Sequence, residues 1–255
     1  MADKTLQRNA AAYRLAALDA EFIRGDSMRG VHLLLEYSKA EERLRSWGIH
    51  STVVVFGSAQ NGPAGQHATS RLAAWYDEAR RFARIVSERG GALTPVDGVH
   101  RNVIATGGGP GIMEAAASGA GPDRALGVSI RLPFEELPSD SVTGSSHHVT
   151  MKYFFTRKLM LVKESSGFLC LPGGFGTLDE TLELLTLQQT GKMEPAPIVL
   201  LDRPGGTYWR GFARFVTEEL AGTGMISIDD LDRVLITDSV EAAIDEITGF
   251  WRNYD

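Results

Sequence analysis

From residue 51 to the end of the chain, short runs of Val, Ile and Leu alternate with longer amphipathic stretches. Short apolar runs of this kind are typical of strands that are buried on both faces of a parallel sheet. Seven strands are predicted, at Thr52–Phe56, Asn102–Thr106, Ala125–Ile130, His147–Met151, Gly167–Leu171, Pro197–Leu201 and Arg233–Thr237. The stretches between them predict helices near residues 69–89, 111–120, 153–165, 177–190, 207–221 and 239–252. Alternating strands and helices predict an α/β fold with a parallel sheet.

The first 50 residues show a different pattern, with apolar residues at helical spacing. The residues that carry it are Leu15, Leu18, Phe22, Val31, Leu34, Leu35 and Tyr37. Two helices are predicted, over residues 5–24 and 30–46, with a break between Gly25 and Gly30. We therefore expect residues 1–50 to form an N-terminal helical extension that serves packing or oligomer contact, and residues 51–255 to form one domain.

Composition excludes several classes of protein. The 255 residues include 26 Lys and Arg against 32 Asp and Glu, and a formal net charge of −6 argues against a protein that coats nucleic acid. The single cysteine, Cys170, excludes an intrachain disulfide and a cysteine metal cluster, and its apolar surroundings predict a buried strand residue. Apolar runs fall far short of the ~18 residues of a membrane span, and no signal-peptide core is found in the first 25 residues. We expect a soluble, cytoplasmic protein.

Glycine changes the picture, because the chain has 28 glycines and three of the predicted strands are followed by glycine-containing loops. The first loop holds Gly57 and Ser58, the second is the run 107–111, and the third is the run 172–177. Ligands of an open parallel sheet bind beyond the carboxyl ends of its strands. Glycine lets backbone N–H groups approach an anion, and the N-terminus of a following helix adds positive potential. Three such loops predict a phosphate-bearing ligand.

The spacing of residues in these loops excludes two classes of phosphate ligand site. Neither rich loop has the Gly-Lys-Ser/Thr of a nucleoside triphosphatase, and Glu114 stands where a dinucleotide loop would have its third glycine. A mononucleotide or a sugar phosphate fits better. Two structural alternatives stay open: Thr177 and Glu180 have the spacing of a helix capping box, and Arg157 and Lys158 can be solvated charges. His147 and His148 are neighbours on one strand and point to opposite faces, so we expect structural histidines and no metal.

The third loop, Pro172-Gly173-Gly174-Phe175-Gly176-Thr177-Leu178-Asp179-Glu180, has the form Pro-Gly-Gly-x-Gly-Thr-x-x-Glu, with Arg157-Lys158 upstream. Together with the runs 107–113 and 127–133, it resembles the LONELY GUY family, the cytokinin riboside 5′-monophosphate phosphoribohydrolases. The resemblance covers roughly residues 50–250 and is closer to the longer bacterial members, which have often been labelled lysine decarboxylases. That label requires pyridoxal phosphate on a lysine, and the sequence singles out no such lysine.

The resemblance implies a Rossmann-like, doubly wound sheet of about seven strands, which would make residues 51–255 a nucleotide-binding catalytic domain. It implies hydrolysis of the N-glycosidic bond of adenosine 5′-monophosphate (AMP) or an N6-substituted AMP, without a cofactor. It also implies a homodimer or higher homo-oligomer with sites near the dimer interface. The catalytic pair carries over to Arg157 and Glu180. The substrate- and phosphate-binding positions are Ser58, Gly109, Gly111, Met113, Glu114, Lys158, Gly173, Gly174, Gly176 and Thr177.

The chemistry gives these residues definite tasks. Breaking the C1′–N9 bond develops positive charge on the ribose, which a carboxylate stabilises while it orients or deprotonates the attacking water. Glu180 is the first candidate and Asp179 the second, and Arg157 supplies a permanent positive charge. Smaller family members have Met four positions after this arginine, where this chain has Leu161, and Met160 stands one position earlier. Contacts to the substituent of the base therefore stay open.

Two other classes of function remain at this point. A binding module, such as a nucleotide-binding or molybdenum-cofactor carrier protein, would use similar glycine loops without hydrolysing anything. A nucleotide-sensing regulator would bind without turnover and change its oligomeric state. A carrier has no need of Arg157 together with Glu180, so this pair favours the enzyme.

Overall fold

The computed structural model describes residues 13–60, 70–121, 124–131 and 147–254. Seven strands form one sheet in which every neighbouring pair is parallel. They are β1 (Thr52–Phe56), β2 (Val103–Thr106), β3 (Ala125–Ile130), β4 (His148–Met151), β5 (Ser165–Cys170), β6 (Ile198–Leu201) and β7 (Val234–Thr237). All seven predicted strands are confirmed, and only their ends differ, by one or two residues.

The strand order is β4-β3-β2-β1-β5-β6-β7. The chain starts in the middle with β1, builds outward to β4, returns beside β1 with β5 and then builds outward to β7. This is the doubly wound, Rossmann-like arrangement that was predicted. Because the winding direction reverses between β1 and β5, the loops after these two strands lie at the topological switch point, where sheets of this kind commonly bind ligands.

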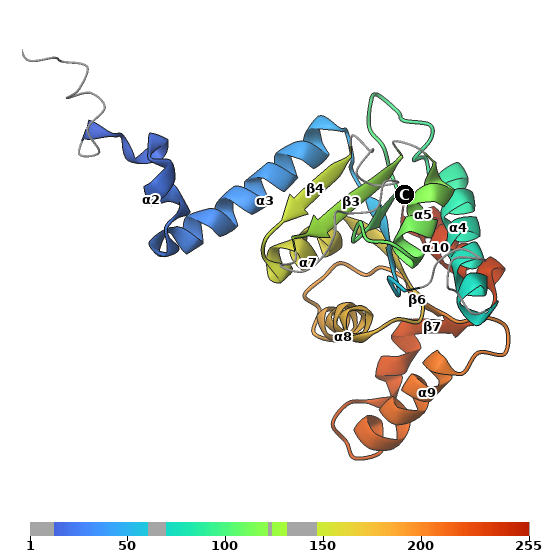
Figure 1. Cartoon of the computed structure of the whole chain (residues 1–255). Coiled ribbons are helices and arrows are strands. Elements are labelled where there is room, and N and C mark those ends of the chain that lie inside the picture. The colour runs from blue at the N-terminus through green and yellow to red at the C-terminus, as the bar shows by residue number, and fades with distance from the viewer. Residues whose placement is uncertain (1–12, 61–69, 122–123, 132–146, 255) are drawn as a thin grey trace, which may run out of the picture.

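Helices cover both faces of the sheet (Figure 1). One face carries α4 (Ser70–Arg89), α5 (Ile112–Ala120) and α10 (Val240–Tyr254). The other carries α3 (Arg29–Ser46), α7 (Phe154–Val162), α8 (Phe175–Gln189) and α9 (Tyr208–Phe215), which continues as a π-helical segment over Val216–Ala221. Side chains of β1 alternate between the two cores, Val53 and Val55 on one side and Val54 and Phe56 on the other. This alternation explains why the strand is apolar throughout.

The N-terminal extension differs from the prediction. Where the sequence predicts one helix over residues 5–24, the described part contains a 3-10 turn (Ala16–Leu18) and the short helix α2 (Ala20–Arg24). The Asp19 carboxylate accepts hydrogen bonds from the N–H groups of Glu21 and Phe22, so it starts a new helix there and breaks the predicted one. Residues 5–12 of that predicted helix lie outside the described ranges.

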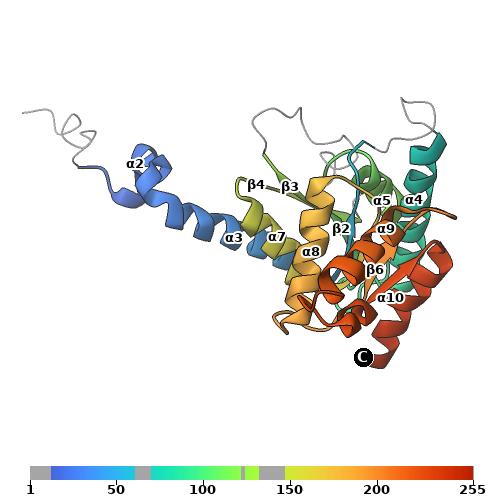
Figure 2. The ribbon, with the colours of Figure 1, turned by 90° about the horizontal axis from the view of Figure 1, so that it is seen from below.

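Helix α3 joins this extension to the domain. Ala40 and Leu44 in its second half are buried against the sheet, whereas α2 and the first half of α3 project away from the body of the molecule (Figures 1 and 2). A 3-10 turn over Asp26–Met28 links the two helices. The domain boundary at residue 50 stays a prediction. Helix α3, which precedes this boundary, contributes Ala40 and Leu44 to the core of the domain that follows it.

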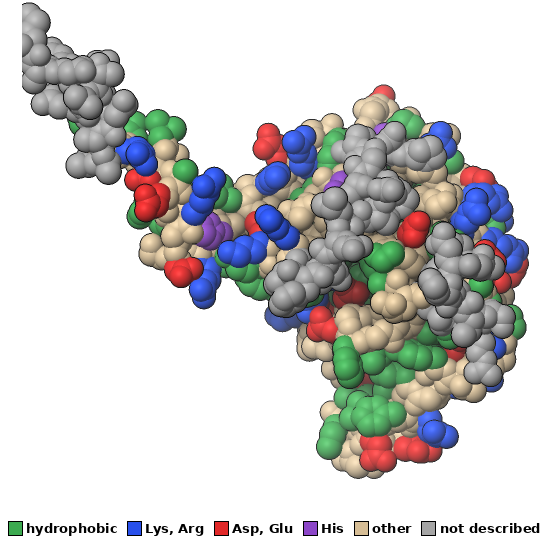
Figure 3. Space-filling model, viewed as in Figure 1, with side chains coloured by type: hydrophobic (Ala, Val, Ile, Leu, Met, Phe, Trp, Pro, Cys, Tyr) green, Lys and Arg blue, Asp and Glu red, His purple; other side chains and the backbone are tan. Residues whose placement is uncertain are grey.

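Several large apolar side chains lie on the surface. On α7 and α8, Phe154, Phe155 and Leu159 are about half exposed, and Phe175 is 93% exposed. Figure 3 shows hydrophobic side chains over the projecting N-terminal helices and around α8 and α9. Within the described ranges, no helix has the length and hydropathy needed to cross a membrane.

Candidate active site

The three glycine loops meet at the carboxyl ends of β1, β2 and β5. The N–H of Ser58 donates to the carbonyl oxygen of Pro172 at 3.2 Å, and the carbonyl oxygen of Ser58 accepts from the N–H of Ile112 at 3.1 Å. The loop after β1 is thus hydrogen-bonded to both of the other loops. The sequence placed these loops at one edge of a sheet, and the structure joins them into one site.

Glycine is required where the loops touch. Gly111 has a φ of +73°, and a Cβ there would lie 2.4 Å from the carbonyl oxygen of Ser58. A Cβ on Gly173 would lie 2.1 Å from the Thr177 hydroxyl and 3.0 Å from the Ser58 nitrogen. By contrast, a Cβ on Gly174 or on Gly176 would meet no protein atom within 4 Å. Close packing of the protein therefore explains why residues 111 and 173 are glycines. At Gly174 and Gly176 packing gives no such reason, and the absence of a side chain leaves space beside the loop.

Helix α8 begins inside this loop, which corrects two expectations. The helix starts at Phe175, two residues before the predicted residue 177, with Gly174 as its N-cap and no capping side chain. The capping box of Thr177 and Glu180, one of the two alternatives that the sequence left open, is therefore excluded, because Thr177 is already the third helical residue and is buried against Gly173. Among the described residues, no hydrogen bond engages the N–H groups of Phe175, Gly176 and Thr177, and Leu178 is the first to donate, to Gly174. Free N–H groups at a helix N-terminus are suited to bind an anion.

Arg157 of α7 and Glu180 of α8 form an ion pair beside this helix start. The Nη2 of Arg157 donates to Oε1 of Glu180, and the two side chains are only 12% and 11% exposed. The loop after β2 lies against the same arginine, since a Cβ on Gly107 would be 3.3 Å from its Nη1. The Phe154 ring lies 5.6 Å from the Arg157 Cζ. The pair is therefore enclosed by α7, α8 and a glycine loop.

Burial sets the protonation behaviour of Glu180. Loss of water around the carboxylate raises the pKa of Glu180 to about 7, although the positive charge of Arg157 acts in the opposite direction. The neighbouring Asp179 is 57% exposed and pairs with Lys158 at 3.2 Å. A carboxyl group with a pKa near neutral pH is suited to general acid–base catalysis, and Glu180 is the more buried of the two carboxylates considered from the sequence.

Lys158 lies next to Arg157 but is engaged by other groups. Its ammonium is 2.9 Å from a carboxylate oxygen of Glu183 and 3.2 Å from one of Asp179, both on α8. Burial lowers the pKa of Lys158, but the hydrogen bonds to these two carboxylates outweigh it and raise that pKa. The structure thus places Lys158 in the contact between α7 and α8, and its predicted role in substrate binding stays a prediction.

The remaining predicted residues lie on α5 and α7. The Met113 side chain lies against Gly107 and Gly109, where added Cβ atoms would be 3.0 and 2.6 Å from it. The charge of Glu114 acts on Tyr76 of α4, where burial and this carboxylate raise the pKa of the phenol. Met160 and Leu161 are 2% and 1% exposed and pack in the hydrophobic core. Neither can contact the substituent of a base in this arrangement.

The cysteine and the two histidines occupy structural positions in the fold. Cys170 is fully buried, as predicted, and burial raises the pKa of its thiol to about 12, so it is an unreactive core residue. His148 Nε2 lies 2.8 Å from the Ser129 hydroxyl, and the His147 ring packs at 4.9 Å edge-on to Trp47. The described ranges hold no group of three or more His, Cys, Asp or Glu residues arranged to bind a metal ion.

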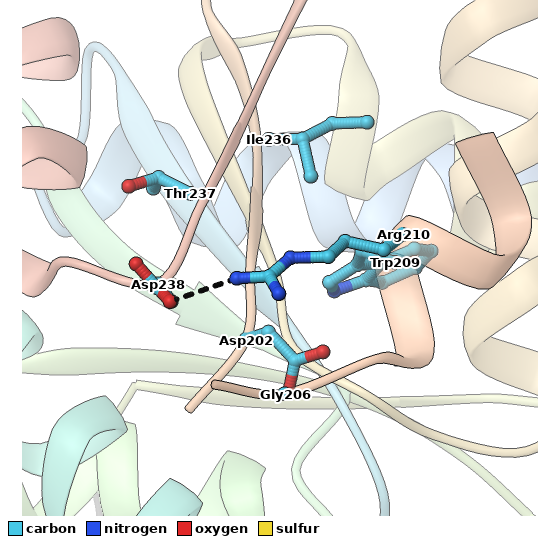
Figure 4. A pocket seen from close by; sticks show the side chains of 7 residues that line it. All are labelled: Asp202, Gly206, Trp209, Arg210, Ile236, Thr237 and Asp238. Atoms are coloured by element: carbon cyan, nitrogen blue, oxygen red, sulfur yellow. Dashed lines mark hydrogen bonds and ion pairs between the residues drawn. The ribbon is translucent and has the colours of Figure 1, made fainter. Parts of the chain in front are cut away.

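Sequence analysis missed two residues beside the third loop. The hydroxyl of Tyr208, the first residue of α9, donates to the carbonyl oxygen of Gly173 at 2.8 Å. Asp202, which follows β6, accepts from the Tyr208 N–H at 2.9 Å. A cavity of about 210 Å³ lies next to them, at the ends of β6 and β7, and its lining includes Asp202 and Trp209 (Figure 4). This cavity is separate from Arg157 and Glu180. The only sequence signal was the position of Asp202 directly after an apolar strand.

Comparison with protein families agrees with this geometry. A family model described as "Possible lysine decarboxylase" matches residues 103–247, which is more than half of the chain and includes the second and third loops and the Arg157–Glu180 pair. The chain belongs to this family. The resemblance to the phosphoribohydrolases is also confirmed, because relatives that match this chain carry that name.

Two of these relatives illustrate the match. A cytokinin riboside 5′-monophosphate phosphoribohydrolase of Mycobacterium marinum is 34% identical over 96 residues, which are 38% of this chain and 49% of the relative. One of Arabidopsis thaliana is 38% identical over 71 residues, which are 28% of this chain and 32% of the relative. The matched region thus spans less than half of each of these two relatives, so their activity comes to this member of the family only as a proposal.

A solved structure supports the fold. A structural-genomics target designated TM1055 aligns with a TM-score of 0.50 and 23% identity, covering 78% of this chain and 99% of that chain. At this identity the likeness shows the shared Rossmann-like fold alone.

Proposed function

We propose that this family member hydrolyses the N-glycosidic bond of AMP or of an N6-substituted AMP, releasing the free base and ribose 5-phosphate. The observation that carries the proposal is the buried Arg157–Glu180 pair beside the unpaired N–H groups that start α8. The pair supplies a carboxylate and a fixed cation, and the helix start supplies an anion site. The names of the relatives in Mycobacterium marinum and Arabidopsis thaliana support the same reaction.

The proposed mechanism assigns one task to each group. The substrate phosphate binds the N–H groups of Phe175, Gly176 and Thr177, which holds the ribose over Glu180. As the C1′–N9 bond breaks, its electron pair leaves with the base, and the Glu180 carboxylate stabilises the cationic ribose. Water attacks C1′ and gives one proton to Glu180, and this proton then passes to the departed base, so that neutral base is released and Glu180 is ionised again. Arg157 orients this carboxylate and donates to the reacting nucleotide.

The test is chromatography of the products after pure protein is incubated with AMP, isopentenyladenosine monophosphate, GMP or CMP. We expect free base and ribose 5-phosphate from one or both adenine nucleotides. Binding of these nucleotides without base release would identify a carrier or sensor and contradict the proposal. The four substrates also decide whether AMP or the N6-substituted form is preferred.

Decarboxylation of lysine, which the family description names, does not fit these residues. Pyridoxal phosphate chemistry needs a lysine whose pKa is lowered so that its amine can form a Schiff base. Among the described lysines, Lys158 is the one beside the site, and its two carboxylate partners raise its pKa instead. Its ammonium is held in ion pairs with Asp179 and Glu183 of α8.

The activity is expected to rise with pH through neutrality. Glu180 must be ionised to act as a base, and its pKa is raised to about 7, so kcat/KM should fall about tenfold per pH unit below that value. Above pH 8 the rate should be level, because Glu180 is then almost fully ionised. The measurement is kcat/KM for base release from pH 5 to 9. The substrate phosphate titrates near pH 6 and would contribute to the same part of the profile. A parallel profile with adenosine, which has no phosphate, therefore shows the fall in kcat/KM that is due to Glu180 alone. A profile that is flat from pH 5 to 9 with both substrates would contradict this assignment.

Two glycines of the third loop are expected to respond in opposite ways to alanine. Gly176→Ala puts a methyl group into open space on a helix, so the melting temperature should hold or rise, since alanine gains ~1 kcal/mol over glycine in a helix. The same methyl group obstructs the phosphate, and the KM for AMP should rise. Gly173→Ala collides with Thr177 and Ser58 and should lower the melting temperature. Thermal unfolding and steady-state kinetics of both variants check this. An unchanged KM in Gly176→Ala would place the phosphate elsewhere.

We also propose that the chain forms a homo-oligomer. Phe154, Phe155 and Leu159 of α7 and Phe175 of α8 expose apolar surface beside the active site. Contiguous apolar patches on soluble proteins commonly mark contact surfaces. Sedimentation at micromolar concentration measures the assembly state, and a monomer would contradict this proposal.

A further inference from the structure

Tyr208 links α9 to the loop that starts α8. Its hydroxyl donates to the carbonyl oxygen of Gly173 at 2.8 Å. Gly173 is also enclosed by Ser58 and Thr177, whose atoms occupy the space that a side chain would need. The peptide that joins Gly173 to Gly174 therefore has one of its two polar groups, the carbonyl, fixed by a side chain from a distant part of the chain.

The Tyr208 ring is itself held firmly. The Asp202 carboxylate, 5% exposed, accepts from the Tyr208 N–H at 2.9 Å and from the Trp75 Nε1 at 3.2 Å. Asp202 thus caps α9 from six residues upstream, and Gly206 makes this approach possible because a Cβ there would overlap the carboxylate (Figure 4). Trp209 is fully buried and packs edge-on against the Tyr208 ring, with centroids 4.8 Å apart.

The direction of the Gly173 carbonyl decides where the next N–H points. A trans peptide is planar, and its C=O and N–H groups point in opposite directions. All described peptide bonds are trans. With the carbonyl of Gly173 turned towards α9, the N–H of Gly174 points away from α9. A peptide between two glycines turns over easily, because neither residue has a Cβ to restrict it. If it turned over, a carbonyl oxygen would face the anion site and repel a phosphate.

We propose that Tyr208 is a positioning residue that orients the Gly173–Gly174 peptide, so that the Gly174 N–H joins the free N–H groups of α8 in binding the substrate phosphate. The inference rests on the proposed function for its substrate, and it assigns to α9 a role in phosphate affinity. Tyr208 touches neither the ribose nor the base in this account, so it acts on binding through the phosphate alone.

The ionisation state of Tyr208 agrees with this role. Burial and the nearby Asp202 raise the pKa of the phenol, although its hydrogen bond to Gly173 acts in the opposite direction. The hydroxyl therefore remains protonated, and able to donate, throughout the neutral range.

The experiment compares wild type with Tyr208→Phe, which removes the hydroxyl and keeps the ring. The KM for AMP should rise about tenfold, the scale of one lost hydrogen bond that orients a charged contact, with a smaller change in kcat. Kinetics with adenosine, which carries no phosphate, should be unchanged. Inhibition by orthophosphate should weaken by a similar factor. Tyr37→Phe, which removes a tyrosine hydroxyl on α3, is the matched control and should leave all of these values unchanged.

Two outcomes of these kinetics would overturn the inference. Equal losses with AMP and adenosine, together with a lower melting temperature than that of Tyr37→Phe, would show a merely structural role. Unchanged AMP kinetics and phosphate inhibition would show no role. If no nucleotide is hydrolysed, the proposed function fails separately, and calorimetric binding of AMP and orthophosphate to the two proteins still tests Tyr208. If Tyr208→Phe does not fold, the Gly174 amide resonance of wild type is followed during phosphate titration, where an unmoved signal overturns the inference.

Discussion

Replacing Glu180 with Gln is expected to abolish base release while leaving nucleotide binding intact. Glutamine has the same shape, and its amide oxygen still accepts from Arg157, so the contact between α7 and α8 persists. What disappears is the negative charge that stabilises the ribosyl cation and takes the proton from water. The loss in kcat should be ~100-fold or more, as for removal of a positioned general base. The measurement is kcat for base release, alongside calorimetric binding of AMP to the variant.

Asp179→Asn is the matched control for this variant. Asp179 is the adjacent residue on α8, but its side chain is 57% exposed and forms a partly solvent-exposed ion pair with Lys158. Such pairs contribute little to stability, so this variant should keep its fold and its kcat. If Asp179→Asn were inactive and Glu180→Gln active, the reacting carboxylate would be Asp179. Full activity in a folded Glu180→Gln protein would refute the mechanism.

Adenosine is expected to be a far poorer substrate than AMP. The N–H groups of Phe175, Gly176 and Thr177 have no protein partner among the described residues, and only a substrate with a phosphate can use them. Losing these charge-assisted hydrogen bonds together implies a loss in kcat/KM on the order of 100-fold or more. Binding energy from the remote phosphate also orients the ribose over Glu180, so kcat should fall as well as KM rise.

Steady-state kinetics of both substrates with one enzyme preparation measures this difference. Gly176→Ala provides an internal control, because it should reduce the rate with AMP towards the rate with adenosine and leave adenosine itself unaffected. Equal kcat/KM for the two substrates in wild type would mean that the glycines serve packing alone. The phosphate site would then have to be abandoned, whatever the outcome with Glu180.

Much of the fold could be predicted from the sequence because its signals are local. A buried parallel strand is apolar along its whole length, so Thr52–Phe56 and the six other strands are visible as runs of Val, Ile and Leu. The glycine loops are visible for a similar reason, since close backbone approach excludes any side chain. Signals of this kind failed in the N-terminal extension, where Asp19 ends one helical segment and begins the next without disturbing the apolar spacing.

The candidate site depended on both levels. The sequence alone determined which residue types are present, located the three glycine loops and identified Arg157 and Glu180 as parts of one family motif. Tertiary structure decided what these residues do: it started α8 at Phe175 and so removed the capping box, and it buried Glu180, which raises its pKa to about 7. It also brought Tyr208 to Gly173 across 35 positions of sequence. Burial and hydrogen bonding between distant segments exist only once the chain has folded, and no local pattern of residues encodes them.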